Sequence, residues 1–220
     1  MTEPFQIYFA GDLFDHKDLI GNSLLRSYIE KISAGRYRCA MPQDLGEEID
    51  PQGIRNRNFK EILESDLALF NFDGNELDSG TVAEFIFAKF MDVPSVIFRS
   101  DFRSSGDQGS SGDDWNLMLS FFPRTRSFQY NAMAWYKASK AEFKTDDAVI
   151  RDLYTKVATG IIQTLDEVRQ EPSLMANHQI DPELIYQWAA LVPGGNFTPD
   201  VSDKTYLRNL VLRKQKKGVL

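Results

Sequence analysis

Short apolar runs alternate with segments of helical spacing between residues 6 and 101. The apolar runs are 6–10, 36–42, 67–73 and 93–101, and the helical segments are 19–32, 54–66 and about 80–91. Strands that alternate with helices in this way form a parallel sheet with helices on both faces. We therefore predict an α/β fold: a five-stranded parallel sheet flanked by helices, flavodoxin-like or Rossmann-like, with its fifth strand within 127–136.

The longest helical pattern runs from Asp147 to Arg169, with its apolar residues on one face. We expect this helix to cover the sheet and to complete an α/β domain over 1–170 that carries the functional site. Residues 171–220 are predicted to form a helical C-terminal extension, with a helix at 182–191 followed by a basic tail.

The extension contains an apolar group too large to remain exposed without reason. Its members are Leu184, Ile185, Trp188, Ala189 and Leu191. We expect this group to dock against the body or against a neighbouring subunit. The basic residues of the tail are expected to lie on the acidic surface or in solvent; they are Arg213, Lys214, Lys216 and Lys217. A disordered tail is the alternative for the last ten residues.

One polar segment, 101–114, is rich in Gly and Ser and is long for a loop in a compact domain. Its composition predicts a mobile loop. Both a plain surface loop and a lid over a site remain open for it.

Composition restricts the chemistry and the partners. The net charge of −7 argues against nucleic-acid binding, which needs a basic field. Cys39 is the only cysteine, and His16 and His178 are the only histidines, so a thiolate or histidine metal site has few ligands. We expect no metal and no cofactor, no membrane span and a cytoplasmic location, with no secretory signal at the start.

Glu84 raises the central question of the sequence, because it stands in a nearly all-apolar helix. Ligands of open parallel sheets bind beyond the carboxyl ends of the strands, so the loops after 7–10, 67–72 and 96–98 should matter. Glu84 follows the second of these loops. A carboxylate there is costly unless it is hydrogen-bonded or functional. The helix N-terminus should favour its ionised form.

Three structural interpretations of Glu84 compete with a functional one. Thr81 and Glu84 fit a capping box. Residues 73–84 approach a calcium loop, but Leu77 and Asp78 occupy its fifth and sixth positions, and the sixth needs glycine. A solvated face is the third interpretation, although the apolar neighbours leave little polar face.

The functional interpretation pairs Glu84 with Asp78, six residues earlier on the loop. Two carboxylates in one cleft suit reaction at an anomeric carbon. One attacks as the nucleophile, and the other handles the proton of the leaving group.

Four stretches in order resemble the nucleoside 2-deoxyribosyltransferase family over roughly residues 5–135. They are "IYFAGDLF", "NFKEILESDLALFNFDG", "DSGTVAEFIFAKFMDVPSVIFRSDFR" and "WNLM". The run from Asp78 to Thr81, with Glu84 following, resembles the D-x-G-[TL]-x-x-E signature of that family. The resemblance implies a double displacement with net retention, in which Glu84 attacks C1' of a 2'-deoxynucleoside and a second base then attacks the deoxyribosyl-enzyme.

The resemblance also implies roles for individual residues. Tyr8 matches the tyrosine that holds the nucleophile, and Asp78 matches the carboxylate that contacts the base and helps to move its proton. Asn58 matches a position near the base, and Gly80 would let the backbone approach the substrate. Asn116 resembles the asparagine that binds deoxyribose hydroxyls from a neighbouring subunit, which implies a homo-oligomer.

Asp12, in the first loop, is expected to reach the base or the sugar. The implied partners are 2'-deoxynucleosides and free nucleobases, with no nucleic acid and no membrane. Relatives that hydrolyse deoxynucleoside monophosphates carry Gly, Ser and Arg in this loop, where Asp12 and Asp15 would here repel an anion. An N-glycosidase is the runner-up, and a nucleoside-binding module without turnover is a further alternative.

Overall fold

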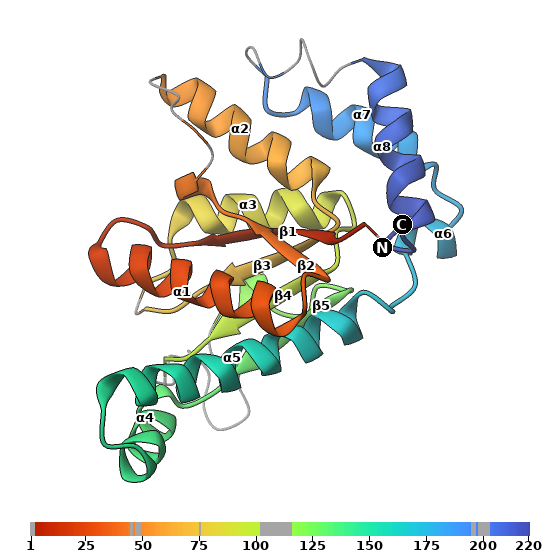
Figure 1. Ribbon diagram of the computed structural model, residues 1–220. Coiled ribbons are helices and arrows are strands. Elements are labelled where there is room, and N and C mark those ends of the chain that lie inside the picture. Colours follow the sequence, from red (N-terminus) through yellow and green to blue (C-terminus); the bar gives the residue numbers. More distant parts are fainter. Residues whose placement is uncertain are drawn as a thin grey trace.

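A five-stranded, wholly parallel sheet forms the centre of the computed structural model, in the order β2-β1-β3-β4-β5 (Figure 1). The structure describes residues 3–44, 46, 50–74, 76–101, 116–194, 197 and 203–220. The strands are β1 (Phe5–Gly11), β2 (Tyr37–Ala40), β3 (Leu67–Asn71), β4 (Ser95–Arg99) and β5 (Thr125–Gln129). This order is that of flavodoxin-like folds, with the switch point between β1 and β3, and the predicted fold is confirmed.

Helices cover both faces of the sheet (Figure 1). One face packs against α1 (His16–Ile32) and α5 (Asp146–Val168), and α4 (Ala132–Glu142) lies outside α5. The other face packs against α2 (Pro51–Glu64) and α3 (Ser79–Phe90). The predicted helix at 147–169 is therefore confirmed as α5.

The central strand β3 explains why the sheet needs two layers of helices. Leu67, Ala68, Leu69 and Phe70 are all fully buried. Successive side chains of a strand point to opposite faces. Accordingly, Ala68 and Phe70 join the core under α2 and α3, whereas Leu67 and Leu69 join the core under α1 and α5. A continuous apolar run is typical of a strand buried on both faces.

The C-terminal extension forms α6 (Leu174–Asn177), α7 (Pro182–Leu191) and α8 (Lys204–Lys216), which lie beside α2 and α3 (Figure 1). Its docking onto the body is confirmed, but the buried face of α7 differs from the prediction. Tyr186, Ala189 and Ala190 are buried there. Leu184 and Trp188 are instead exposed by 61% and 67%. Tyr186, Ala189 and Ala190 share one face of the helix through their i, i+3 and i+4 spacing, and that face joins the core under α2 and α3.

The predicted basic tail is wrong as a tail, because 204–216 is helix α8 with Asp203 as its N-cap. Lys214 is only 1% exposed, so it lies neither on the surface nor in solvent.

The region of the predicted fifth strand differs in extent from the observed strand, since β5 ends at Gln129 and Asn131 caps helix α4. The predicted short helix near 115–122 is the 3-10 turn η2 (Leu117–Leu119), and most of the 101–114 loop lies outside the described residues.

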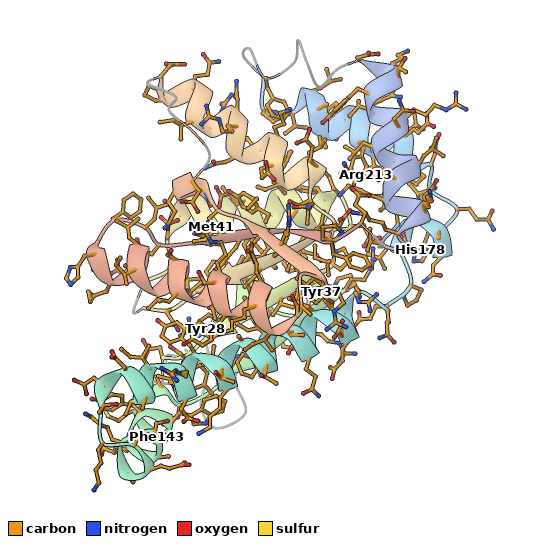
Figure 2. The ribbon with its side chains drawn as sticks, viewed as in Figure 1. Tyr28, Tyr37, Met41, Phe143, His178 and Arg213 are labelled. Atoms are coloured by element: carbon orange, nitrogen blue, oxygen red, sulfur yellow. The ribbon has the colours of Figure 1, made fainter. Side chains whose placement is uncertain are left out.

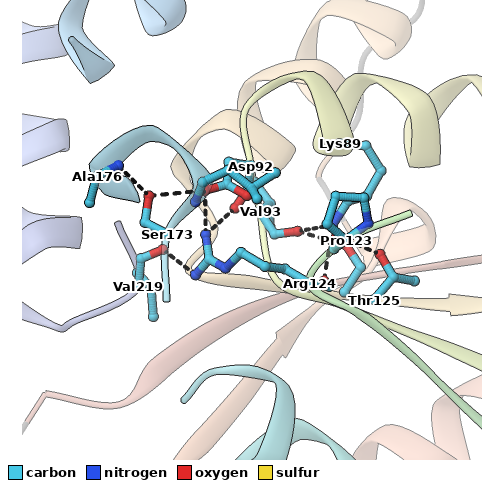
Figure 3. Close-up of polar contacts among 11 residues, drawn as sticks. Lys89, Asp92, Val93, Pro123, Arg124, Thr125, Ser173, Ala176 and Val219 are labelled. Carbon is cyan, nitrogen blue, oxygen red and sulfur yellow. Dashed lines mark hydrogen bonds and ion pairs between the residues drawn. The ribbon is translucent and has the colours of Figure 1, made fainter. Parts of the chain in front are cut away.

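A buried ion pair joins the extension to the body (Figure 3). Arg124 donates to the Asp92 carboxylate at 2.6 Å, and both side chains are almost completely buried. The same carboxylate accepts from the Ser173 hydroxyl at 3.0 Å. Arg124 also donates to the carbonyl of Val219 at 2.9 Å. Both ends of the extension are thus held by one pair of charges.

Among the described residues, none of the helices combines the length and the apolar character that a membrane crossing requires.

We predict that Asp92→Asn lowers the free energy of unfolding by about 3 kcal/mol, because it leaves the buried guanidinium of Arg124 without its counter-charge. Asparagine keeps the shape and tolerates the left-handed backbone at this position, where φ is 56°. Urea unfolding followed by circular dichroism measures the change. Asp146→Asn, which breaks the exposed pair with Lys140, is the control and should leave the midpoint unchanged. Equal midpoints for both variants would contradict the role of the buried pair.

Candidate active site

A cleft of about 300 Å³ opens beyond the carboxyl ends of β1 and β3, at the switch point of the sheet. Four segments line it: the loop after β1, the loop after β2, helix α2 and the start of α3 with its N-cap. The lining residues are Gly11, Leu13, Phe14, Pro42, Asn58, Asp78, Ser79, Gly80, Thr81 and Glu84. Glu84, Asp78, Asn58 and Gly80 were predicted as site residues, and the fold brings them into one cleft.

Glu84 is held through one of its two carboxylate oxygens. The Tyr8 hydroxyl, from β1, donates to Glu84 Oε1 at 2.7 Å. The Asn58 amide, from α2, donates to the same oxygen at 3.2 Å. Among the described residues, Oε2 receives no hydrogen bond, so one oxygen is fixed while the other stays available at the cleft.

Burial raises the pKa of Glu84 to about 7. The hydrogen bonds from Tyr8 and Asn58 act in the opposite direction, and the nearby charge of Asp78 adds to the rise. The sequence predicted that the helix N-terminus would favour the ionised form. The net shift of the pKa is nevertheless upward, because Glu84 lies in the second turn of α3, where loss of hydration outweighs the helix dipole.

The Tyr8 hydroxyl remains a donor at every physiological pH. Tyr8 is fully buried, and burial together with the charge of Glu84 raises its pKa well above the usual range. The hydrogen bond from Tyr8 to Glu84 therefore persists whether or not Glu84 is ionised.

Asp78 both caps α3 and faces the cleft. Its Oδ2 accepts from the Thr81 amide at 2.6 Å and from the Thr81 hydroxyl at 2.7 Å. The capping-box interpretation, with Thr81 as the cap and Glu84 reaching back, is therefore wrong: Asp78 is the N-cap, and Glu84 turns toward Tyr8.

Gly80 leaves room for the Asp78 carboxylate. A Cβ atom at Gly80 would lie 3.1 Å from Asp78 Oδ2, which is closer than most Cβ contacts. The glycine in the signature thus protects the position of the neighbouring carboxylate. That Gly80 also lets the backbone approach the substrate closely stays a prediction.

Two predicted site residues do not join this cleft. Asp12 accepts from the Phe14 amide at 3.3 Å and does not line the cleft. Asn116 caps the η2 turn, where its side-chain oxygen accepts from the Met118 amide at 3.0 Å. Neither contact tests the role that the sequence suggested.

Sequence reasoning missed several lining residues, notably Leu13, Phe14 and Pro42. Phe14 is 79% exposed, which is unusual for a phenylalanine without a partner. The one signal for them in the sequence was their position, because they follow the carboxyl ends of β1 and β2. Pro42 shows that the loop after β2 also matters. The loop after β4 is mostly outside the described residues.

No cluster of three His, Cys, Asp or Glu suited to a metal ion occurs within the described ranges. Asp73, first in the calcium-like spacing, instead accepts from the amide and hydroxyl of Ser100 and ties β3 to β4. His178 lies on the extension, at the far side of the molecule from α1 (Figure 2).

We predict that Glu84→Gln stabilises the fold above pH 7. The raised pKa means that folding disfavours the ionised carboxylate, so the wild-type protein loses stability as the pH rises from about 4.5 through about 7. The neutral amide avoids this loss, and the gain should reach about 1–3 kcal/mol at pH 8. Urea unfolding at pH 5 and pH 8 measures it. A gain of equal size at both pH values would contradict the assignment.

The sequence model of nucleoside 2-deoxyribosyltransferase matches residues 7–122. No curated protein matches the chain. Among solved structures, a conserved protein from Enterococcus faecalis V583 is 22% identical, with a TM-score of 0.48, over 64% of this chain and 99% of that one.

Two further solved structures are similar. The 2-desoxiribosyltransferase from Leishmania mexicana is 21% identical, with a TM-score of 0.45, over 64% of this chain and 100% of that one. The 2-deoxyribosyltransferase from Bacillus psychrosaccharolyticus is 15% identical, with a TM-score of 0.44, over 66% of this chain and 95% of that one. Because the family model spans more than half of the sequence, the chain belongs to the nucleoside 2-deoxyribosyltransferase family.

Proposed function

We propose that this protein transfers the 2-deoxyribosyl group between nucleobases of 2'-deoxynucleosides, with Glu84 as the nucleophile. The observation that carries the proposal is the asymmetric holding of Glu84. Tyr8 and Asn58 both donate to Oε1, and Asp78 stands in the same cleft. This arrangement orients Oε2 for attack while a second carboxylate is present for the base.

In the first half-reaction, Glu84 Oε2 attacks C1' and the bond from C1' to the base nitrogen breaks. The bonding electron pair leaves with the base, which takes up a proton with the help of Asp78. The product is a deoxyribosyl ester of Glu84 and a free nucleobase. In the second half-reaction, an incoming base attacks C1', loses its proton and releases the Glu84 carboxylate. Two inversions at C1' give net retention.

The raised pKa of Glu84 fits this cycle. A desolvated carboxylate is a better nucleophile than a hydrated one. A carboxylate with a higher pKa is also a poorer leaving group, so the ester persists until the second base arrives. Tyr8 keeps its proton throughout, so it can hold Oε1 in the free enzyme and in the ester.

The loop after β1 favours nucleosides over nucleotides as the substrates of this proposal. The amino end of α1 would be a natural phosphate site, since its amides point outward. Here Asp15 accepts from the amides of Lys17 and Asp18, at 2.7 Å and 3.2 Å. The Asp12 carboxylate accepts from the amide of Phe14. Carboxylates of the chain therefore already occupy the donors that a phosphate would need.

A homo-oligomer with shared sites is part of the proposal. Beside Asn116, the side chains of Leu117, Met118 and Phe121 are exposed by 56%, 79% and 84%. Such an apolar group favours burial against another surface. Covering it with a second subunit would bring Asn116 toward the deoxyribose in the neighbouring cleft.

Base exchange tests the proposed function directly. The protein is incubated with one 2'-deoxynucleoside and a different free base, and the products are separated by chromatography. The proposal predicts a new nucleoside. Free deoxyribose without a new nucleoside would identify a hydrolase instead, and unchanged reactants would leave a binding module; either result overturns the transferase assignment.

We predict that Glu84→Ala and Glu84→Gln each abolish base exchange, because an amide or a methyl group cannot form the ester. Glu142→Gln, an exposed glutamate on α4, is the control and should exchange at the wild-type rate. Retention of more than about a tenth of the activity, an effect of under ~1.4 kcal/mol on the barrier, would show that Glu84 is not the nucleophile.

We predict that Asp78→Asn slows exchange by roughly 10²- to 10⁴-fold, the range for loss of general acid–base catalysis. Asparagine also caps helices well, so the fold should persist. Tyr8→Phe should be milder, because it removes only a hydrogen bond and Asn58 still holds Oε1. Steady-state kinetics on both variants give the ranking, and a Tyr8→Phe enzyme slower than Asp78→Asn would reverse it.

A further inference from the structure

One side of α8 donates hydrogen bonds to the segment where α2 ends and the link to β3 begins. The donor residues are spaced by seven, one and three positions along the chain, which places them on one side of the helix. They are Tyr206, Arg213 and Lys214 of α8 and its C-cap Lys217, and they contact Glu64, the last residue of α2, and Ser65 and Asp66 of the link. Each residue of the link thus receives at least one donor from α8.

The contacts at Glu64 fix the last residue of α2. The Tyr206 hydroxyl donates to the Glu64 carboxylate, and Arg213 donates to the Glu64 carbonyl at 2.6 Å. Arg213 lies between α8 and the body (Figure 2). Because α2 ends with Glu61 and Glu64, its C-terminus lacks the cations that stabilise a helix end, and α8 supplies them from outside.

The contacts at Ser65 and Asp66 are deeply buried. Lys214 is 1% exposed and donates to the Ser65 carbonyl. Lys217 donates to the fully buried Asp66 carboxylate at 2.7 Å. Buried charges are tolerated only with good partners, so this geometry is strongly specified. The basic residues of the C-terminus are therefore largely used inside the molecule.

Helix α2 joins the contacts at Glu64 to the cleft, because Asn58 lies on the same helix. Asn58 lies six residues before Glu64, about 9 Å along one helix at ~1.5 Å per residue. Its hydrogen bond to Glu84 is 3.2 Å long, at the upper end of the usual range, so a small shift of α2 would break it. Phe197 of the extension packs edge-on against Phe59, next to Asn58, with ring centroids 6.4 Å apart.

We propose that α8 positions the catalytic carboxylate at a distance: Tyr206 and Arg213 fix α2 so that Asn58 donates to Glu84. This inference rests on the proposed function of Glu84. Tyr206 and Arg213 touch no reacting atom and are positioning residues. The C-terminal extension is then part of the catalytic apparatus, and not only a cover for the core.

The test uses the full chain with Tyr206→Phe/Arg213→Met, and with Asn58→Ala as the reference. Losing the Asn58 hydrogen bond should raise the pKa of Glu84, so the acid limb of kcat/KM for base exchange should move up by about one pH unit. Arg208→Met, on the exposed side of α8, is the matched control and should not move it. The other titratable groups near Glu84 are Tyr8 and Asp78, with Glu61 near Tyr8. Because the charge of Arg213 lowers the pKa of Glu61, Tyr206→Phe alone, which keeps that charge, is measured beside the double variant.

The decisive result is non-additivity. In an Asn58→Ala background, the α8 variant should add no further shift, because the hydrogen bond is already lost. A folded α8 variant with an unmoved acid limb, or a full additional shift in the Asn58→Ala background, would overturn the inference. If the double variant does not fold, Tyr206→Phe alone removes one hydrogen bond and gives the same readout at smaller amplitude.

A second readout separates this inference from the proposed function. The pKa of Glu84 can be followed by ¹³C-glutamate NMR titration, with Glu84→Gln to assign the signal. If the wild-type protein exchanges no bases, the proposed function fails, but the titration still decides whether α8 acts on Glu84. An unchanged titration in the α8 variant contradicts the inference alone.

Discussion

The contact of the Glu84 carboxylate with its two donors, Tyr8 and Asn58, is what the candidate site depends on. The bond from Tyr8 joins the first strand of the sheet to the helix after the third strand, across 76 positions of the sequence. The apolar surroundings that bury Glu84 also raise its pKa to about 7. The fold thus holds a carboxylate in an environment that disfavours its charge, and two donors on one oxygen offset part of that cost.

The parallel sheet and the C-terminal extension constrain this contact from opposite ends. The sheet places β1 and β3 side by side, so Tyr8 and the loop that carries Asp78 meet at one edge. The extension is attached at the amino ends of the strands, through the buried pair of Asp92 and Arg124 before β4 and β5 and through the contacts of α8 before β3. Stability is expected to depend on the buried pair of Asp92 and Arg124, whereas we propose that the geometry of the cleft depends on the contacts of α8 with α2.

Much of the fold and part of the site could be predicted from the sequence. The apolar run at 67–73 forms β3 because a strand buried on both faces needs such a run, and Glu84 is conspicuous because its helix is otherwise apolar. Helix α8 was missed, since its arginines and lysines indicate a solvated segment unless their partners at 64–66 are known. Phe14 and Pro42 were missed because only the three-dimensional arrangement of the loops brings them to the cleft. The upward shift of the Glu84 pKa was missed for the same reason, since burial is a property of the whole fold.

Trapping of the proposed deoxyribosyl ester shows whether Glu84 is the nucleophile. A 2'-deoxy-2'-fluoronucleoside destabilises the positive charge that develops on the sugar, so it slows turnover of a glycosyl ester once the ester has formed. The protein is incubated with this compound, digested and analysed by mass spectrometry. We expect added mass of the fluorinated sugar on the peptide that contains Glu84, and none in Glu84→Gln. Added mass on a different carboxylate, or full inactivation with no covalent adduct, would contradict this assignment.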